Sequence, residues 1–152
     1  KMAVGLKLQF SQLENFQKYL RNKFSSLQNH LFQKIISYDA EISVNQINNE
    51  LLNIVEQMEP FGKGNEEPEF LIRDIIIEKI KILKDKHFLI FFKNDQGLNL
   101  KGISFNSKDS EIGDYLLKHQ QFKFYFLGSL KRDNFTNNNI PQLIVHDTKV
   151  IN

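Results

Sequence analysis

The residues of this sequence best suited to bind a ligand are cations and aromatic rings that occur close together. Lys131, Arg132 and Phe135 share one short stretch between two predicted strands. Cationic side chains bind phosphates and an exposed phenyl ring stacks on an unpaired base, so this combination favours single-stranded nucleic acid. Solvated surface charge is the alternative interpretation for each lysine, and a contact between domains is the alternative for Phe91. The full set of predicted nucleic-acid-binding residues is Arg73, Lys81, Phe91, Lys101, Lys131, Arg132 and Phe135.

Hydrolytic chemistry is not predicted for this chain. Two-metal cleavage of a phosphodiester needs carboxylates and histidines held a few ångströms apart, but the four histidines fall in separate predicted elements. His146 and Asp147 are neighbours on a predicted strand and therefore point to opposite faces. Gly62 and Gly64 follow a predicted helix, which indicates a turn and not a dinucleotide-binding loop. We predict no catalytic residue, no metal ligand and no cofactor here.

The composition sets the class of protein. The chain has 152 residues, 41% of them hydrophobic and 25% charged, which is typical of a globular protein. It has no cysteine, which excludes disulfides and agrees with the reducing cytoplasm. No apolar run is long enough to cross a membrane. The net charge is only +2, a weak basic excess for a nucleic-acid-binding protein.

The first part of the chain is predicted to be helical or mixed. Ser11 and Glu14 have capping-box spacing and begin a helix expected to end between Phe24 and His30. A short strand is predicted over 33–38, because isoleucine and tyrosine favour strands. A second capping box, Ser43 with Gln46, begins another helix. The predicted core face of that helix consists of Ile47, Leu51, Ile54, Val55 and Met58.

A linker and a β-rich segment follow. The stretch 59–69 holds two of the three prolines, and its predicted turn residues are Pro60, Phe61, Gly62, Gly64, Asn65 and Pro68. After Pro68 the hydrophobic period changes from that of a helix to that of a strand. The segments that alternate are strands at 70–83, 87–92, 98–105, 122–130 and 142–150, with a helix at 110–119 between the third and fourth.

This order predicts an α+β protein that ends in an oligonucleotide-binding (OB) barrel, a five-stranded β-barrel with its helix between strands 3 and 4. Alternation places Phe88, Ile90 and Phe92 in the core, with His87, Leu89 and Phe91 on the outer face. The phenylalanines at 122, 124 and 126 are likewise predicted to be barrel core.

The linker resembles that of the RecJ family of single-stranded-DNA exonucleases. Residues 58–70 follow its pattern Leu-Glu-Pro-Phe-Gly-x-Gly-Asn-x-x-Pro-x-Phe, with Met58 in place of leucine. Tyr38-Asp39-Ala40-Glu41-Ile42 is similar to the family's segment before the linker. Gln142-Leu143-Ile144-Val145-His146-Asp147 is similar to its last strand.

The resemblance implies a division into the C-terminal end of a DHHA1-like domain (1–58), a linker (59–69) and an OB domain (70–152). It implies a non-catalytic part of a 5′-to-3′ single-stranded DNA exonuclease of repair and recombination, which binds single-stranded DNA. Manganese or magnesium would belong to a separate catalytic domain, which is the expected partner together with single-strand-binding protein. The alternative is a module that packs on the nuclease core or docks a repair partner, with little DNA affinity.

Overall fold

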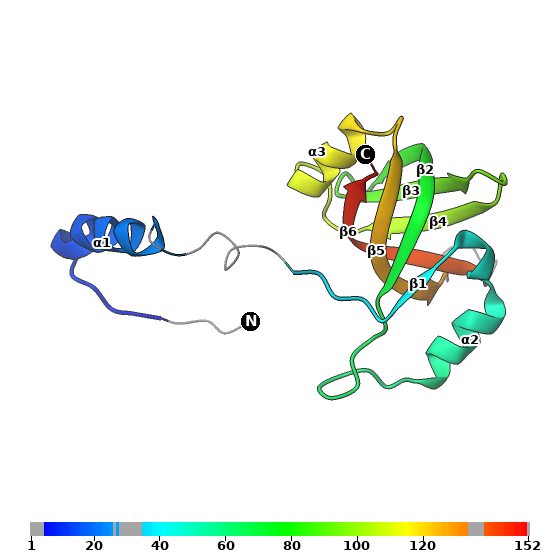
Figure 1. Ribbon diagram of the computed structural model, residues 1–152, viewed down its shortest axis with the longest axis horizontal. Coiled ribbons are helices and arrows are strands. Elements are labelled where there is room, and N and C mark those ends of the chain that lie inside the picture. Colours follow the sequence, from blue (N-terminus) through cyan, green and yellow to red (C-terminus); the bar gives the residue numbers. More distant parts are fainter. Residues whose placement is uncertain (1–4, 26, 28–34, 134–138, 152) are drawn as a thin grey trace. The chain divides into compact units, whose positions relative to one another are not determined.

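The chain forms two compact units, residues 1–36 and 37–152, in a computed structural model that describes residues 5–25, 27, 35–133 and 139–151 (Figure 1). The first unit contains a 3-10 turn, η1 (Phe10–Gln12), and helix α1 (Leu13–Ser25). The predicted helix is therefore confirmed, but Ser11 lies inside the 3-10 turn and does not cap the helix from outside. None of the α1 residues is buried.

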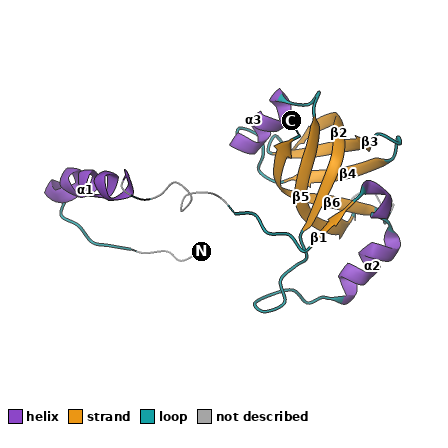
Figure 2. Ribbon diagram, viewed as in Figure 1, coloured by secondary structure: helices purple, strands orange, loops and turns teal. Residues whose placement is uncertain are grey.

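The second unit is built on a closed five-stranded barrel. Its sheet has the order β1-β2-β3-β4-β6-β5, and a further pairing of β2 with β5 closes it. Helix α3 (Glu111–Lys118) connects the third and fourth barrel strands (Figure 2), so the predicted OB fold is confirmed. The barrel strands are β2 (Phe70–Leu83), β3 (His87–Asn94), β4 (Asn99–Ser104), β5 (Lys123–Arg132) and β6 (Pro141–Val150).

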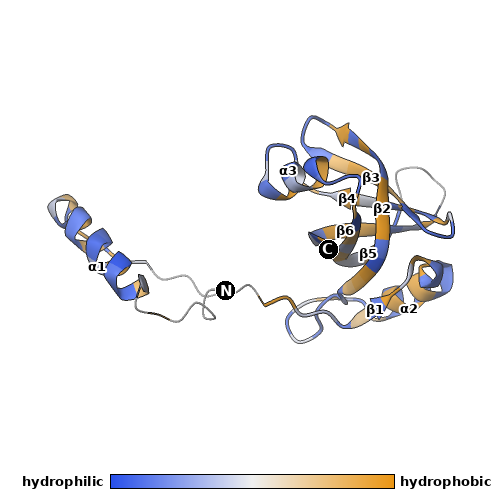
Figure 3. Cartoon of the chain, turned by 45° about the horizontal axis from the view of Figure 1, so that its top comes forward, coloured by the Kyte–Doolittle hydropathy of each residue, from blue (hydrophilic) through white to orange (hydrophobic). Residues whose placement is uncertain are grey.

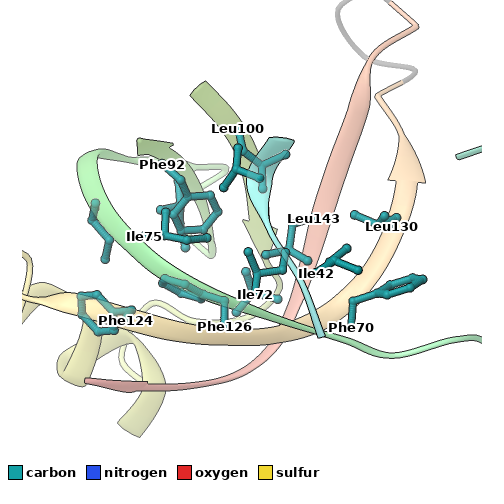
Figure 4. Close-up of a cluster of buried hydrophobic side chains, with 14 of the residues drawn as sticks. Ile42, Phe70, Ile72, Ile75, Phe92, Leu100, Phe124, Phe126, Leu130 and Leu143 are labelled. Carbon is teal, nitrogen blue, oxygen red and sulfur yellow. The ribbon is translucent and has the colours of Figure 1, made fainter. Parts of the chain in front are cut away.

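Alternating side chains fill the barrel interior. Phe88, Ile90 and Phe92 on β3 are buried as predicted. Figure 4 shows Phe92 pointing toward Phe126 of β5, and the centroids of these two rings are 4.6 Å apart. The prediction was wrong for Phe122, which is 44% exposed because it precedes β5 and so lies outside the alternation of that strand.

Short turns and a cap fix the connections between barrel elements. A tight turn joins β3 and β4 as a hairpin, in which the Asn94 backbone N–H donates to Leu98 and the Asn94 carbonyl accepts from Gly97. Ser110 caps α3 by accepting a hydrogen bond from the Gly113 backbone N–H at 3.2 Å. Leu116 of this helix is fully buried, so α3 contributes to the core.

Residues 37–58 belong to the barrel unit. Strand β1 (Ala40–Ile42) extends the sheet in parallel with β2, and helix α2 (Asn49–Gln57) packs with Leu52 and Val55 in the hydrophobic core. The division between the units thus falls at 36/37, whereas the sequence predicted a boundary at 59–69. The burial of the apolar side of α2 against the barrel explains the difference.

The other predictions for this segment need correction. Residues 35–38 form no regular structure, and the neighbouring part of the predicted strand, 33–34, lies outside the described residues. The capping box of Ser43 and Gln46 is confirmed, but it begins the 3-10 turn η3 (Val44–Gln46), and Asn48 caps α2 instead. The buried side of α2 also differs from the predicted core face, because it includes Leu52, which was not among the predicted core residues. Ile54 and Met58 are exposed.

The stretch 59–69 is an ordered turn. Gly62 and Asn65 exchange backbone hydrogen bonds of 2.8 and 3.0 Å, and Gly64 has a φ of +86°. The Asn65 side-chain amide donates to the carbonyl oxygens of Met58 and Pro60, at 2.8 and 3.0 Å. Phe61 packs against the barrel core. Helix α2 ends at Gln57, three residues before Pro60.

Strand β2 carries hydrophobic stretches separated by shorter hydrophilic ones (Figure 3). Among the described residues, no helix has the length and apolar character that crossing a membrane requires.

Candidate nucleic-acid interface

One row of side chains runs across the outer face of the barrel. Strand register places Lys79 beside Phe91, Phe91 beside Lys101, Lys101 beside Gln142 and Gln142 beside Lys131. Paired residues in neighbouring strands project to the same face. The row therefore combines three cations, one aromatic ring and one amide on the sheet surface that OB folds use for oligonucleotides.

The next row on the same face is apolar. Leu89 pairs with Ile103 and Ile103 with Ile144, and Phe105 follows directly after β4. A cleft of about 420 Å³ opens over Leu89, Ile103 and Phe105. Its polar lining residues are Lys84, His87, Lys101, Asp133 and Gln142.

A second cavity adjoins this cleft. It has a volume of about 490 Å³ and shares Ile103, Phe105 and Gln142 with the cleft. Its other walls come from α2 and from the end of β5, through Glu56 and Arg132 among others. We call the two cavities together the outer groove, and it crosses the barrel from the β2–β3 turn toward α2.

The aromatic residues of the outer groove are accessible. Phe105 is 54% exposed, and its ring meets the His87 ring edge to face at 5.3 Å. The His87 Nδ1 atom accepts a hydrogen bond from the Asn106 backbone N–H at 3.0 Å, which fixes the imidazole on the groove wall. Phe91 does not line the outer groove but lies in the adjacent polar row, half-buried beneath the ammonium group of Lys81, 5.3 Å from the ring centroid.

The predicted cation Arg132 is bound within the protein. Its guanidinium donates to both carboxylate oxygens of Glu56 at 2.9 and 2.7 Å, and to the side chain of Asn53 at 2.9 Å. It also donates to the backbone carbonyl of Asn139. The hydrogen bonds from Arg132 lower the pKa of Glu56, and the same contacts raise the pKa of Arg132. Arg132 thus joins α2, β5 and the residues just before β6.

Carboxylates also hold other predicted cations. Lys131 forms an ion pair with Glu67 at 2.5 Å and lies 5.3 Å from the centroid of the Phe61 ring. The ammonium group of Lys101 lies 3.4 Å from the carboxylate of Asp133, which is itself buried. These pairs compensate positive charge at the α2 end of the outer groove.

Arg73 lies in another cavity. It pairs with Glu41 at 2.5 Å and covers the ring of Tyr125. Burial is the largest single influence on the pKa of Arg73 and lowers it, but Glu41, Tyr125 and Tyr38 together outweigh burial, so this pKa is raised. The polar cavity beside Arg73 is lined by residues 41–46, 73–74 and 94–96, apart from the groove-lining residues.

Uncompensated positive charge gathers near the β2–β3 hairpin. Lys79, Lys81, Lys84 and Lys86 make no ion pair with any residue that the structure describes. Lys79 and Lys81 flank Phe91 and Leu89 in register, and Lys84 lines the cleft. The positive end of the outer groove is therefore this hairpin.

The predicted site residues are only partly brought together. Lys81, Phe91, Lys101, Lys131 and Arg132 lie on or beside the outer face, and Phe135 lies outside the described residues. Sequence reasoning did not select the remaining groove residues, although alternation within two strands would have indicated 87, 89, 103 and 105. The missed groove residues are Leu89, Ile103, Phe105, Gln142, His87 and Lys84, and the nearby cations Lys79 and Lys86 were missed as well. Over the described parts of the chain, no three histidine or acidic side chains form a metal site.

Comparison with solved structures finds several proteins whose sequence identity to this chain is low. One chain of the Schizosaccharomyces pombe Stn1–Ten1 complex is 13% identical with a TM-score of 0.44, over 55% of this chain and 57% of that one. The Saccharomyces cerevisiae mitochondrial single-stranded DNA binding protein Rim1 is 11% identical with a TM-score of 0.39, over 55% and 91%. One chain of a Replication Protein A heterotrimer bound to single-stranded DNA is 9% identical with a TM-score of 0.38. The match covers 96% of this chain and 45% of that one. The match to the first of these spans little more than half of its length.

A comparison with curated proteins finds no match. The model of the RecJ OB domain matches residues 38–147, most of the barrel unit and its β1 and α2 extension. This chain therefore belongs to the RecJ OB domain family.

Proposed function

We propose that this chain is the single-stranded DNA-binding OB module of a RecJ-like 5′-to-3′ exonuclease acting in DNA repair and recombination. The observation that carries the proposal is the outer groove, where the exposed ring of Phe105 lies near the lysines without ion pairs on a barrel face that OB folds use for oligonucleotides. Rings bind unpaired bases and lysines bind the phosphates between them. The family match supports the exonuclease as the parent protein.

The chemistry of the groove favours single strands over duplexes. In a duplex the bases stack on one another and present only their edges, so Phe105 and Phe91 would have no base face to contact. An unpaired strand exposes those faces. The proposal therefore includes no sequence specificity from stacking, because every base has a π-face.

Several further parts of the proposal concern the rest of such an exonuclease. On the family match, we assign manganese or magnesium to a separate catalytic domain, the principal intramolecular partner of this module. We propose that residues 1–36 are the end of a DHHA1-like domain. Cytoplasmic location and contact with single-strand-binding protein complete the proposal.

Fluorescence anisotropy with labelled oligonucleotides tests the function. Single-stranded DNA should bind more tightly than duplex of the same length. If the four lysines without ion pairs each contact one phosphate, log K against log salt should have a slope of about −3. Equal affinity for duplex, or a slope near zero, would contradict the assignment.

A docking module is the second candidate function. It is favoured by the carboxylates that neutralise Lys101, Lys131 and Arg132, and by the apolar floor of the cleft. Such a surface suits another protein or the nuclease core. A chain with no single-strand affinity at low salt would support this candidate.

A further inference from the structure

Gln142 is the one amide in the row that crosses the outer face. It lies near the start of β6, in register with Lys101 on one side and Lys131 on the other. Together with Ile103 and Phe105, it lines both cavities of the outer groove. The residue is only 4% exposed, so its amide forms part of the groove floor between the two cavities.

The amide of Gln142 has no hydrogen-bond partner among the residues that the structure describes. Neither polar atom of this amide is among the fully buried atoms without a partner, so the amide reaches the groove although the residue as a whole is almost buried. The neighbouring Asp133 interacts with Lys101, and Arg132 with Glu56, so the polar groups around Gln142 are engaged elsewhere. An unpaired amide on an otherwise apolar floor is suited to a ligand that brings its own donor and acceptor.

We propose that Gln142 hydrogen-bonds the edge of an unpaired nucleobase whose face lies against Phe105. A carboxamide presents a donor and an acceptor side by side, the arrangement with which glutamine binds base edges. Phe105 supplies the apolar ring and the flanking lysines supply positive charge for phosphates. This inference rests on the proposed function and adds to it the residue that distinguishes a base from any other flat apolar group.

The test is a double-mutant cycle between protein and DNA. Wild type and Gln142→Met are titrated with an oligothymidylate and with an oligonucleotide carrying apolar isosteres of thymine, which stack but form no hydrogen bonds. Methionine has the same unbranched length as glutamine and no amide. Wild type should bind the isostere about three- to tenfold more weakly than thymine, the range for one neutral hydrogen bond. Gln142→Met should bind both oligonucleotides equally.

Gln121→Leu is the matched control, since Gln121 is exposed in the turn between α3 and β5. It should discriminate as wild type does. Gln142→Leu replaces the methionine variant if melting shows that the latter is unfolded. Undiminished discrimination by a folded Gln142 variant would overturn the inference while leaving the proposed function intact. A wild type that binds neither oligonucleotide would overturn both.

Discussion

Replacing Phe105 by alanine should weaken binding of single-stranded DNA without unfolding the barrel. Phe105 follows β4, is 54% exposed and lines both cavities of the outer groove. Stacking of one base on an aromatic ring contributes about 1–3 kcal/mol, so the variant should bind about 5- to 150-fold more weakly. The slope of log K against log salt should stay unchanged, because the ring carries no charge.

The cost to stability should be small by comparison. More than half of the Phe105 side chain is already in water, and its only ring contact in the described structure is with His87 at 5.3 Å. Such an edge-to-face contact contributes at most about 0.5–1.5 kcal/mol. Thermal melting followed by circular dichroism measures this loss of stability separately from the loss of binding.

Phe122→Ala is a closely matched control. Phe122 is 44% exposed and also lies near a histidine, His119, with ring centroids 6.0 Å apart. It precedes β5 and is not among the residues that line the outer groove. Both variants should melt alike, but only Phe105→Ala should lose affinity. If wild type binds and both variants bind as well as it does, the outer groove is not the interface.

Three further substitutions, one of them with a matched control, test the fold of the barrel unit. Gly64→Ala should destabilise the chain by about 1–2 kcal/mol, because Gly64 has a φ of +86°, whereas Gly62→Ala should change urea unfolding little. Arg132→Ala should lower the melting temperature. Folding lowers the pKa of Glu56 below 4.5, so the stability difference between wild type and Arg132→Ala should be largest above pH 4.5. It should shrink as the pH falls through the lowered pKa and Glu56 becomes protonated in the folded protein. A difference independent of pH would exclude this ion pair as its cause. Gly128→Ala should cost about 1–3 kcal/mol in urea unfolding, because its Cβ would lie 2.0 Å from a carbonyl oxygen of β6; unchanged unfolding would show that the barrel adjusts.

The barrel was predictable because its signals are local. Alternation along β3 identified which side chains face inward. A strand has only two faces, so once Phe88 and Phe92 are buried, the side of every other residue in β3 is fixed. The Asn94 turn and the Ser110 cap use side chains that act on backbone groups within a few residues. Such interactions depend on spacing alone, so sequence suffices to find them.

The division of the chain was harder to predict, because it depends on contacts distant in sequence. The apolar residues of α2 indicated an amphipathic helix but not its partner. Burial of Leu52 and Val55 attaches that helix to the barrel unit. The turn containing Pro60 and Asn65 has the composition of a linker, yet its hydrogen bonds make it an ordered connection inside one unit.

The same distinction explains the predicted binding residues. Arg132 was selected because arginine beside aromatic residues is typical of phosphate binding, but Glu56, 76 positions away in sequence, binds the Nε and Nη2 atoms of its guanidinium, and Nη1 donates to Asn139. A residue type shows what a side chain could bind, and only the fold shows whether an internal partner already binds it. Lys84 and Lys86, which have no ion pair with a described residue, are therefore better candidates for phosphate contacts than Arg132. The module should contact the nucleic-acid backbone mainly at the β2–β3 hairpin and bases along the apolar floor.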